Sequence, residues 1–111
     1  MRDEKTYCVY ILASKPHGTL YIGFSGDLTS RMEQHLSGAI EGFTKRYGVH
    51  RLVHFEVFGN ASEGIQREKT MKKWPRQWKI NLIERDNPHW DDLHLQTSRN
   101  YQVAPIQFGV S

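Results

Sequence analysis

The chain has 111 residues, of which 38% are apolar and 24% charged, with a net charge of +3 and an isoelectric point near 9.1. These values fit one domain with a modest hydrophobic core. A lone cysteine, Cys8, excludes an internal disulfide and suits a reducing compartment. No apolar run is long enough to cross a bilayer, and the first residues show no signal-peptide core. We therefore expect a cytoplasmic protein with no membrane partner.

The first two predicted strands form a hairpin. Residues 7–13 alternate in side-chain character, and the alternation resumes at residues 19–23 after the turn-forming residues 14–18. If Ala13 pairs with Gly18 across a loop of about four residues, Tyr10 lies directly opposite Tyr21, with both phenols on one face. A slip of one residue would place the two phenols on opposite faces, so this prediction depends on the turn.

A helix is predicted to follow the hairpin, with Asp27 as its N-cap. Arg31 and His35 lie one turn apart on this helix, close enough to act on one ligand. The planar guanidinium of Arg31 suits phosphate, and the imidazole of His35 can accept or donate a proton near neutral pH. These are two of the groups that phosphodiester hydrolysis requires, and the third is an oxygen ligand for a divalent cation.

The second half of the chain is predicted to hold one more strand and two helices. In residues 51–58 the odd positions are Arg51 and then three apolar residues, which predicts a strand with one face on the core. A helix should open at Ser62 and Glu63 and run through Trp74, and the next should start at Pro75. Asn87 and Pro88 then end it. In that last helix Trp78 and Leu82 are expected to pack on the sheet.

Basic residues are concentrated in this helical region. Six of them lie within thirteen residues and are interleaved with Trp74 and Trp78: Arg67, Lys69, Lys72, Lys73, Arg76 and Lys79. A second group includes Lys45 and Arg46. Such a cluster indicates either an ordinary solvated helix face or contact with nucleic-acid phosphates.

The combination of short motifs resembles the GIY-YIG nuclease family, in particular its small stand-alone bacterial members. The resemblance is carried by Cys8-Val9-Tyr10, by Tyr21-Ile22-Gly23, and by Arg31 and His35 in that order, and it covers residues 7–93. It implies an α/β fold of the segregated (α+β) kind, a three-stranded, mainly antiparallel sheet flanked by helices. The domain is expected to span residues 5–93, and residues 94–111 to form a loosely packed or disordered tail.

The resemblance also implies roles for individual residues. Glu68 matches the metal-binding glutamate of the family and would hold one Mg²⁺ or Mn²⁺ ion. Arg31 would face the scissile phosphate, Tyr10 would assist the activation of water, and Tyr21 and His35 would complete the assembly. Without the motif, each of these is an ordinary strand or helix residue, and Lys72 at i+4 makes Glu68 a plain helix-stabilising partner.

This sequence departs from the family pattern at several positions. Cys8 stands where the family name has its first glycine, and Phe24 stands where some relatives place a lysine. The accessory asparagine of many members has Asn81 as its best match, with Asn87 as the alternative.

The function implied is metal-dependent cleavage of DNA phosphodiesters in DNA repair or processing, with low sequence specificity. Branched or single-stranded DNA is the expected partner. The alternative is a non-catalytic nucleic-acid-binding module of a repair complex. A third hypothesis, a protein-interaction domain, would need Trp74, Trp78 and Trp90 to form an exposed patch, whereas we expect them to lie mostly in the core.

Overall fold

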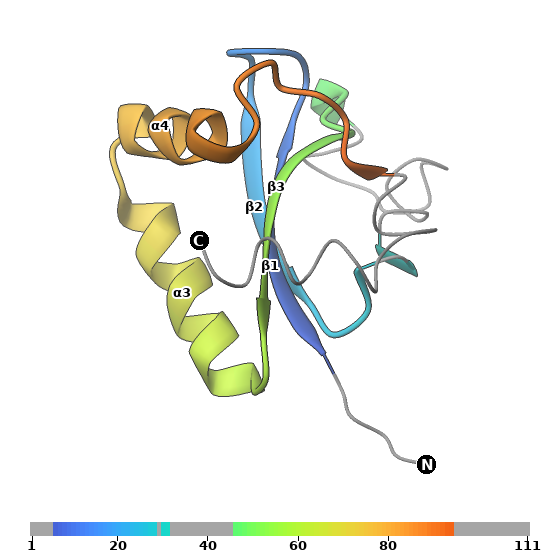
Figure 1. Cartoon of the computed structure of the whole chain (residues 1–111), viewed down its shortest axis with the longest axis vertical. Coiled ribbons are helices and arrows are strands. Elements are labelled where there is room, and N and C mark those ends of the chain that lie inside the picture. The colour runs from blue at the N-terminus through green and yellow to red at the C-terminus, as the bar shows by residue number, and fades with distance from the viewer. Residues whose placement is uncertain (1–5, 29, 32–45, 95–111) are drawn as a thin grey trace.

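The computed structural model describes residues 6–28, 30–31 and 46–94, and these form a three-stranded sheet with helices packed on one face (Figure 1). The strands β1 (Tyr7–Ala13), β2 (Leu20–Ser25) and β3 (Arg51–Phe58) are antiparallel and lie in the order β2-β1-β3. The helices α3 (Ala61–Lys73) and α4 (Arg76–Asp86) lie together against one face. The predicted α+β fold with an antiparallel sheet is confirmed.

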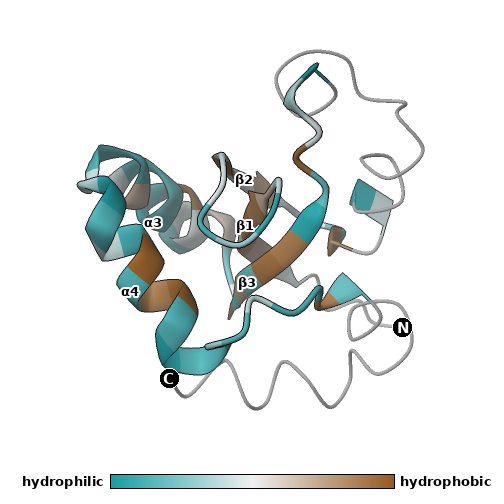
Figure 2. Ribbon diagram, turned by 90° about the horizontal axis from the view of Figure 1, so that it is seen from above, coloured by the Kyte–Doolittle hydropathy of each residue, from teal (hydrophilic) through white to brown (hydrophobic). Residues whose placement is uncertain are grey.

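The sheet is covered on both faces, because its central strand β1 is apolar on both sides. Val9 and Ile11 pack against the helices, whereas Tyr10 and Leu12 belong to a second cluster on the opposite face. The chain after α4 contributes to both clusters. Trp90 packs in the cluster on the helix side, and Leu93 packs in the cluster on the opposite face. Figure 2 shows apolar residues in the strands and in part of α4, and mostly hydrophilic residues in α3.

The hairpin register differs from the predicted one by two residues. Ala13 pairs with Leu20, and Tyr10 therefore lies opposite Gly23 rather than Tyr21. The cause is a longer turn, in which the Ser14 N–H donates to the Thr19 carbonyl at 3.0 Å and the Ser14 hydroxyl accepts from the Thr19 N–H at 3.0 Å. Because side chains alternate with a period of two, an even shift keeps both phenols on the same face.

Strand β3 contains an irregularity that the alternation did not predict. Its register against β1 shifts between Ile11 and Leu12, where Val53 is the extra residue. Leu52 consequently lies on the side of Phe55, and Val53 on the side of the helices. The expectation of one apolar face shared by Val53 and Phe55 was wrong, because the bulge reverses the alternation at this point.

The helix boundaries follow local signals closely. The Asn60 side chain caps α3 by accepting from the Glu63 N–H at 2.9 Å. Pro75 immediately precedes α4, and Asn87 ends it. Around Asp27, the Ser30 N–H donates to the carboxylate at 3.2 Å and the Arg31 N–H to the backbone carbonyl at 3.0 Å, as expected of an N-cap.

The three tryptophans occupy three different environments. Trp90 is 2% exposed, Trp74 is half-buried and Trp78 is 56% exposed. The expectation that Trp78 packs on the sheet was therefore wrong, although Leu82 and Ile83 of the same helix are buried. The predicted tail, residues 94–111, lies outside the described residues except for His94. No helix within the described part of the chain is long and apolar enough to span a membrane.

Candidate functional site

The candidate site is built around Tyr10, which lies on the central strand with its ring over Gly23 of β2. A Cβ atom added at Gly23 would lie 2.9 Å from Cε1 of Tyr10 and would overlap the hydroxyl end of the ring. Glycine is thus the residue that leaves space for the phenol. The Tyr10 side chain is 2% exposed, and its ring is held across the strand pair toward the edge strand.

Tyr21 lies beside Tyr10 on the same face. The two ring centroids are 6.4 Å apart, with planes inclined at 41°. Tyr21 is partly exposed and packs against the cluster that contains Tyr10. The predicted pair of neighbouring phenols is present, in a diagonal rather than a directly opposed arrangement.

Arg31 reaches the site from the helical segment that Asp27 caps. Its backbone is fixed by the hydrogen bond to Asp27, and its side chain is half-buried. Leu28 of the same segment packs in the cluster that contains Tyr10. The first turn of this helix therefore lies against the face of the sheet that carries both phenols.

Glu68 reaches the site from α3, on the other side of the edge strand. Gly64 fixes the contact of α3 with β2, because a Cβ there would lie 2.5 Å from the ring of Phe24. Glu68 follows Gly64 by one helical turn, so it lies along the same side of the helix. The Glu68 side chain is 19% exposed, and its carboxylate forms an ion pair with Lys72 Nζ at 2.9 Å.

The electrostatics of Tyr10 indicate that the charges of Arg31 and Glu68 lie near enough to influence its hydroxyl. Burial is the main cause that raises the pKa of the Tyr10 hydroxyl, and the nearby Tyr21 raises it further. Arg31 lowers this pKa and Glu68 raises it. Charges on two helices from separate parts of the chain thus act on one phenol, as a shared site requires.

The protonation state of Tyr10 follows from the direction of this shift. Because burial raises its pKa, the phenol keeps its proton at neutral pH and can both donate and accept a hydrogen bond. The neighbouring Cys8 is buried, and burial followed by the charge of Asp27 raises the pKa of its thiol to about 11. Cys8 is therefore a thiol at neutral pH, which argues against a role as nucleophile.

Two predicted residues, the candidate catalytic His35 and the candidate DNA-binding Lys45, lie outside the described residues. Within the described part of the chain, no group of three or more His, Cys, Asp or Glu side chains is arranged to hold a metal ion. Glu68 is the carboxylate that the family pattern assigns to a metal ion, and its side chain is partly exposed. A carboxylate donor fits magnesium, which prefers oxygen and retains most of its water ligands.

Several of the predicted DNA-binding residues have partners within the protein. The Arg67 guanidinium donates two hydrogen bonds to Glu56, at 2.8 and 3.0 Å. Arg76 donates to the carbonyls of His17 and Gly18, both at 2.7 Å, and so ties α4 to the hairpin turn. The remaining described ones are exposed: Arg46, Lys69, Lys72 and Lys73.

The two candidate accessory asparagines have different environments. Asn81 is exposed on α4 and accepts a hydrogen bond from Gln77 at 2.9 Å. Asn87 is buried and donates to the carbonyls of Val53 and Asp91 at 3.1 and 2.9 Å. Asn87 therefore fixes the segment that closes the core.

The structure also reveals a buried polar network that the sequence did not indicate. His54 is 1% exposed and its Nε2 lies 2.9 Å from Glu56, which in turn receives the two bonds from Arg67. Burial works to raise the pKa of Glu56, but the hydrogen bonds and charges of His54 and Arg67 prevail and lower it to about 2. The alternation of β3 in the sequence places His54 and Glu56 on one side of the strand, but it does not indicate Arg67 as their partner.

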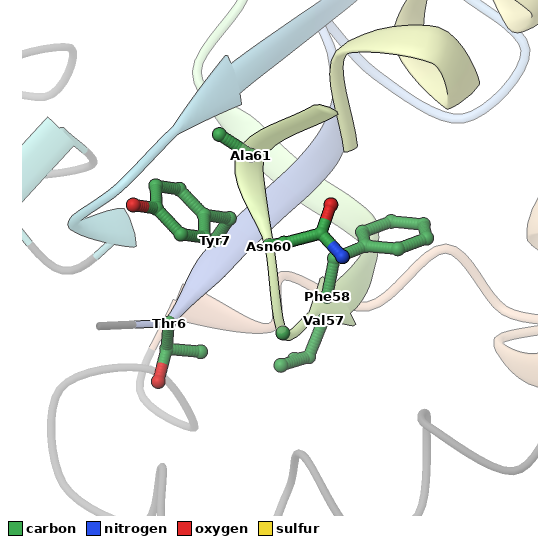
Figure 3. Close-up of a pocket in the computed structure, with 7 residues that line it drawn as sticks. Thr6, Tyr7, Val57, Phe58, Asn60 and Ala61 are labelled. Carbon is green, nitrogen blue, oxygen red and sulfur yellow. The ribbon is translucent and has the colours of Figure 1, made fainter. Parts of the chain in front are cut away.

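A hollow of about 520 Å³ opens elsewhere, where β1 begins and β3 ends (Figure 3). Its lining includes Thr6, Tyr7, Phe58 and Asn60, and none of the candidate catalytic residues. The described residues that line it carry no carboxylate, imidazole or cation, so we place the candidate site at Tyr10 on chemical grounds.

The small antiparallel sheet carries two neighbouring tyrosines, and Arg31 and Glu68 lie on helical segments that flank it. Residues 6–81 match the family described as the GIY-YIG catalytic domain. The chain therefore belongs to the GIY-YIG family, which is associated with endonucleases that act on DNA and generally use a divalent metal ion.

The similar proteins are small bacterial proteins named UPF0213. The one from Oceanobacillus iheyensis is 35% identical over 82 residues, which cover 74% of this chain and 93% of that protein. One from Clostridium perfringens is 39% identical over 75 residues, covering 68% of this chain and 80% of the relative. A UPF0213 protein from Bacillus halodurans, solved by NMR, aligns with a TM-score of 0.51 at 27% identity and covers 81% of this chain and 95% of that one.

Proposed function

We propose that this protein is a divalent-metal-dependent endonuclease that hydrolyses DNA phosphodiester bonds. The observation that carries the proposal is the pair of neighbouring phenols, Tyr10 and Tyr21, on the face of the sheet against which the segment before Arg31 packs. The charges of Arg31 and Glu68 both influence the Tyr10 phenol. One cation, one carboxylate and one proton-carrying hydroxyl are the groups needed to neutralise a phosphoryl centre, hold a metal ion and orient a water. The family to which the chain belongs supports the same chemistry.

Each residue has a role that follows from its chemistry. The Arg31 guanidinium stabilises the negative charge that builds on the phosphoryl oxygens. Tyr10 stays protonated and orients the attacking water by hydrogen bonding, with Tyr21 beside it. By the family pattern His35 moves a proton near neutral pH. The Glu68 carboxylate would hold one Mg²⁺ or Mn²⁺ ion, which supplies charge neutralisation at the phosphate when bound.

We further propose low sequence specificity. The exposed basic residues Lys69, Lys73 and Arg46 suit contacts to phosphates, and phosphate contacts carry no direct sequence information. DNA structure, such as branches or single strands, would then select the substrate in repair or processing. Cleavage confined to one short duplex sequence would contradict this part of the proposal.

A nicking assay on plasmid, single-stranded and branched DNA, with and without Mg²⁺ or Mn²⁺, tests the proposal. We expect metal-dependent cleavage by the native protein and none above background by Glu68→Gln. Glu63→Gln is the matched control, because Glu63 is an exposed acidic residue of the same helix. Salt-dependent DNA binding with no strand scission in either metal would instead support a non-catalytic nucleic-acid-binding module.

A further inference from the structure

The start of α4 carries an indole that the core does not use. Trp78 is the most exposed of the large apolar side chains that the structure describes, at 56%. Trp78 lies in the first turn of α4, where its backbone N–H donates to the Pro75 carbonyl at 3.0 Å. The buried residues of this helix are Ile80, Leu82 and Ile83, whereas the Trp78 indole is mostly exposed at the start of the helix.

A row of contacts nevertheless holds this indole in place. The Trp78 ring meets Trp74 edge to face, with centroids 5.9 Å apart and planes at 67°. The Trp74 ring packs on the helix-side core and lies 5.0 Å from the Arg67 guanidinium carbon. Glu56 fixes Arg67 by two hydrogen bonds. Contacts from Glu56 on β3 through Arg67 and Trp74 thus hold the exposed indole. The side chain therefore loses less conformational entropy when a ligand stacks on it.

The charge around this indole identifies the chemistry of its partner. Residues 69–83, between Glu68 and Glu84, contain five basic residues and no acidic one: Lys69, Lys72, Lys73, Arg76 and Lys79. Lys72 pairs with Glu68 and Arg76 with backbone carbonyls of the hairpin turn. A rigid aromatic side chain within a basic segment is the combination that binds single-stranded nucleic acid, since the cations attract the backbone and the ring stacks on a base. A second copy of this chain would bring like charges together at the same corner.

We propose that Trp78 stacks on an unpaired base of a DNA strand whose backbone lies along the basic corner formed by α3 and α4. The choice of DNA as the partner rests on the proposed function, and the stacking narrows the substrate class to DNA with unpaired nucleotides. Bases in a duplex are already stacked on their neighbours and offer the indole no free face. Trp78 is therefore a binding residue that is distinct from the hydrolytic site at Tyr10.

The test measures binding in the Glu68→Gln background, so that the DNA is not cut. A labelled oligothymidine of about 20 nucleotides and a duplex of equal length serve as probes in fluorescence anisotropy. We expect Trp78→Ala and Trp78→Leu to weaken oligothymidine binding by about fivefold or more, whereas Trp78→Phe keeps most of the affinity. The salt dependence should stay unchanged, because no cation is removed. Ile65→Ala, which trims another exposed apolar side chain, should bind like the parent.

Equal affinity of Trp78→Ala and the parent would overturn the proposal, as would equal losses for the leucine and phenylalanine variants. If sedimentation showed that the parent is a dimer and that Trp78→Ala dissociates it, the indole would bind a second copy of the chain. That result would also overturn the proposal. The two proposals fail separately. Native protein that binds oligothymidine through Trp78 but cuts no DNA refutes the nuclease, whereas cleavage and binding that are both insensitive to Trp78 refute the stacking.

Discussion

The ring of Tyr10 occupies the space that a side chain at Gly23 would need. The two residues lie opposite each other on neighbouring strands, and this pairing aims the phenol across the edge strand of the sheet. The glycine of the Tyr21-Ile22-Gly23 motif is therefore sterically required by the tyrosine of the Cys8-Val9-Tyr10 motif. Its role is to position Tyr10 rather than to contact a substrate.

Gly23→Ala should displace the Tyr10 ring, because the added methyl group overlaps it. We expect the free energy of unfolding to fall by about 1–3 kcal/mol. We also expect the rate of DNA cleavage to fall under conditions in which the variant is still folded. Thermal or urea unfolding and the nicking assay measure the two effects. Gly59→Ala is the matched control, since a Cβ there meets nothing within 4 Å. Full activity of Gly23→Ala would mean that the position of Tyr10 does not matter for cleavage.

Arg31→Ala should slow cleavage about 10²–10³-fold, because it removes the cation assigned to the phosphoryl oxygens. Arg31→Lys should recover part of the rate, since it restores the charge but not the planar fork. Single-turnover cleavage at saturating protein separates this effect from weaker binding. A normal single-turnover rate for Arg31→Ala would place the phosphate elsewhere.

Lys72→Met should tighten the binding of Mg²⁺ or Mn²⁺ about two- to fivefold, because the ammonium group pairs with the carboxylate that would hold the ion. Isothermal titration calorimetry without DNA measures this directly. Lys73→Met removes a neighbouring exposed lysine and should leave metal affinity nearly unchanged. Weaker metal binding by Lys72→Met would show that the lysine supports the site instead of competing for it.

Glu56→Gln should reduce the free energy of unfolding at pH 7 by about 1–3 kcal/mol, because it removes the charge that Arg67 and His54 share. The folded protein lowers the pKa of Glu56 from its ordinary value to about 2, so the native carboxylate stabilises the fold above pH 4.5. That stabilisation is lost as the pH falls from 4.5 toward 2. Urea unfolding across this range should show a shallower acid dependence in the variant.

The control for this prediction is Asp91→Asn, which neutralises an exposed carboxylate. It should change the acid dependence little, because surface charges contribute weakly to stability. An unchanged pH profile for Glu56→Gln would mean that the buried network does not contribute to the pH dependence of stability.

The sequence by itself determined the elements and the family. Asp27, Pro75 and Asn87 mark helix ends through bonds and steric effects that span a few residues, and signals of this short range can be recognised in the sequence alone. The tyrosine motifs and the order of Arg31 and Glu68 led to the family, whereas the roles of these residues remain predictions. The shared face of Tyr10 and Tyr21 was also predictable, since it depends only on the parity of the register.

Only the tertiary structure decided the partners. The six-residue turn between β1 and β2 set Tyr10 opposite Gly23, and the bulge at Val53 reversed the faces of β3. Arg67 was predicted to bind DNA but is paired with Glu56, and Trp78 was expected in the core but is exposed. Such outcomes depend on which distant segments pack side by side. A hydrophobic pattern indicates that a side chain has a buried face available, but packing between helices decides whether that face is covered.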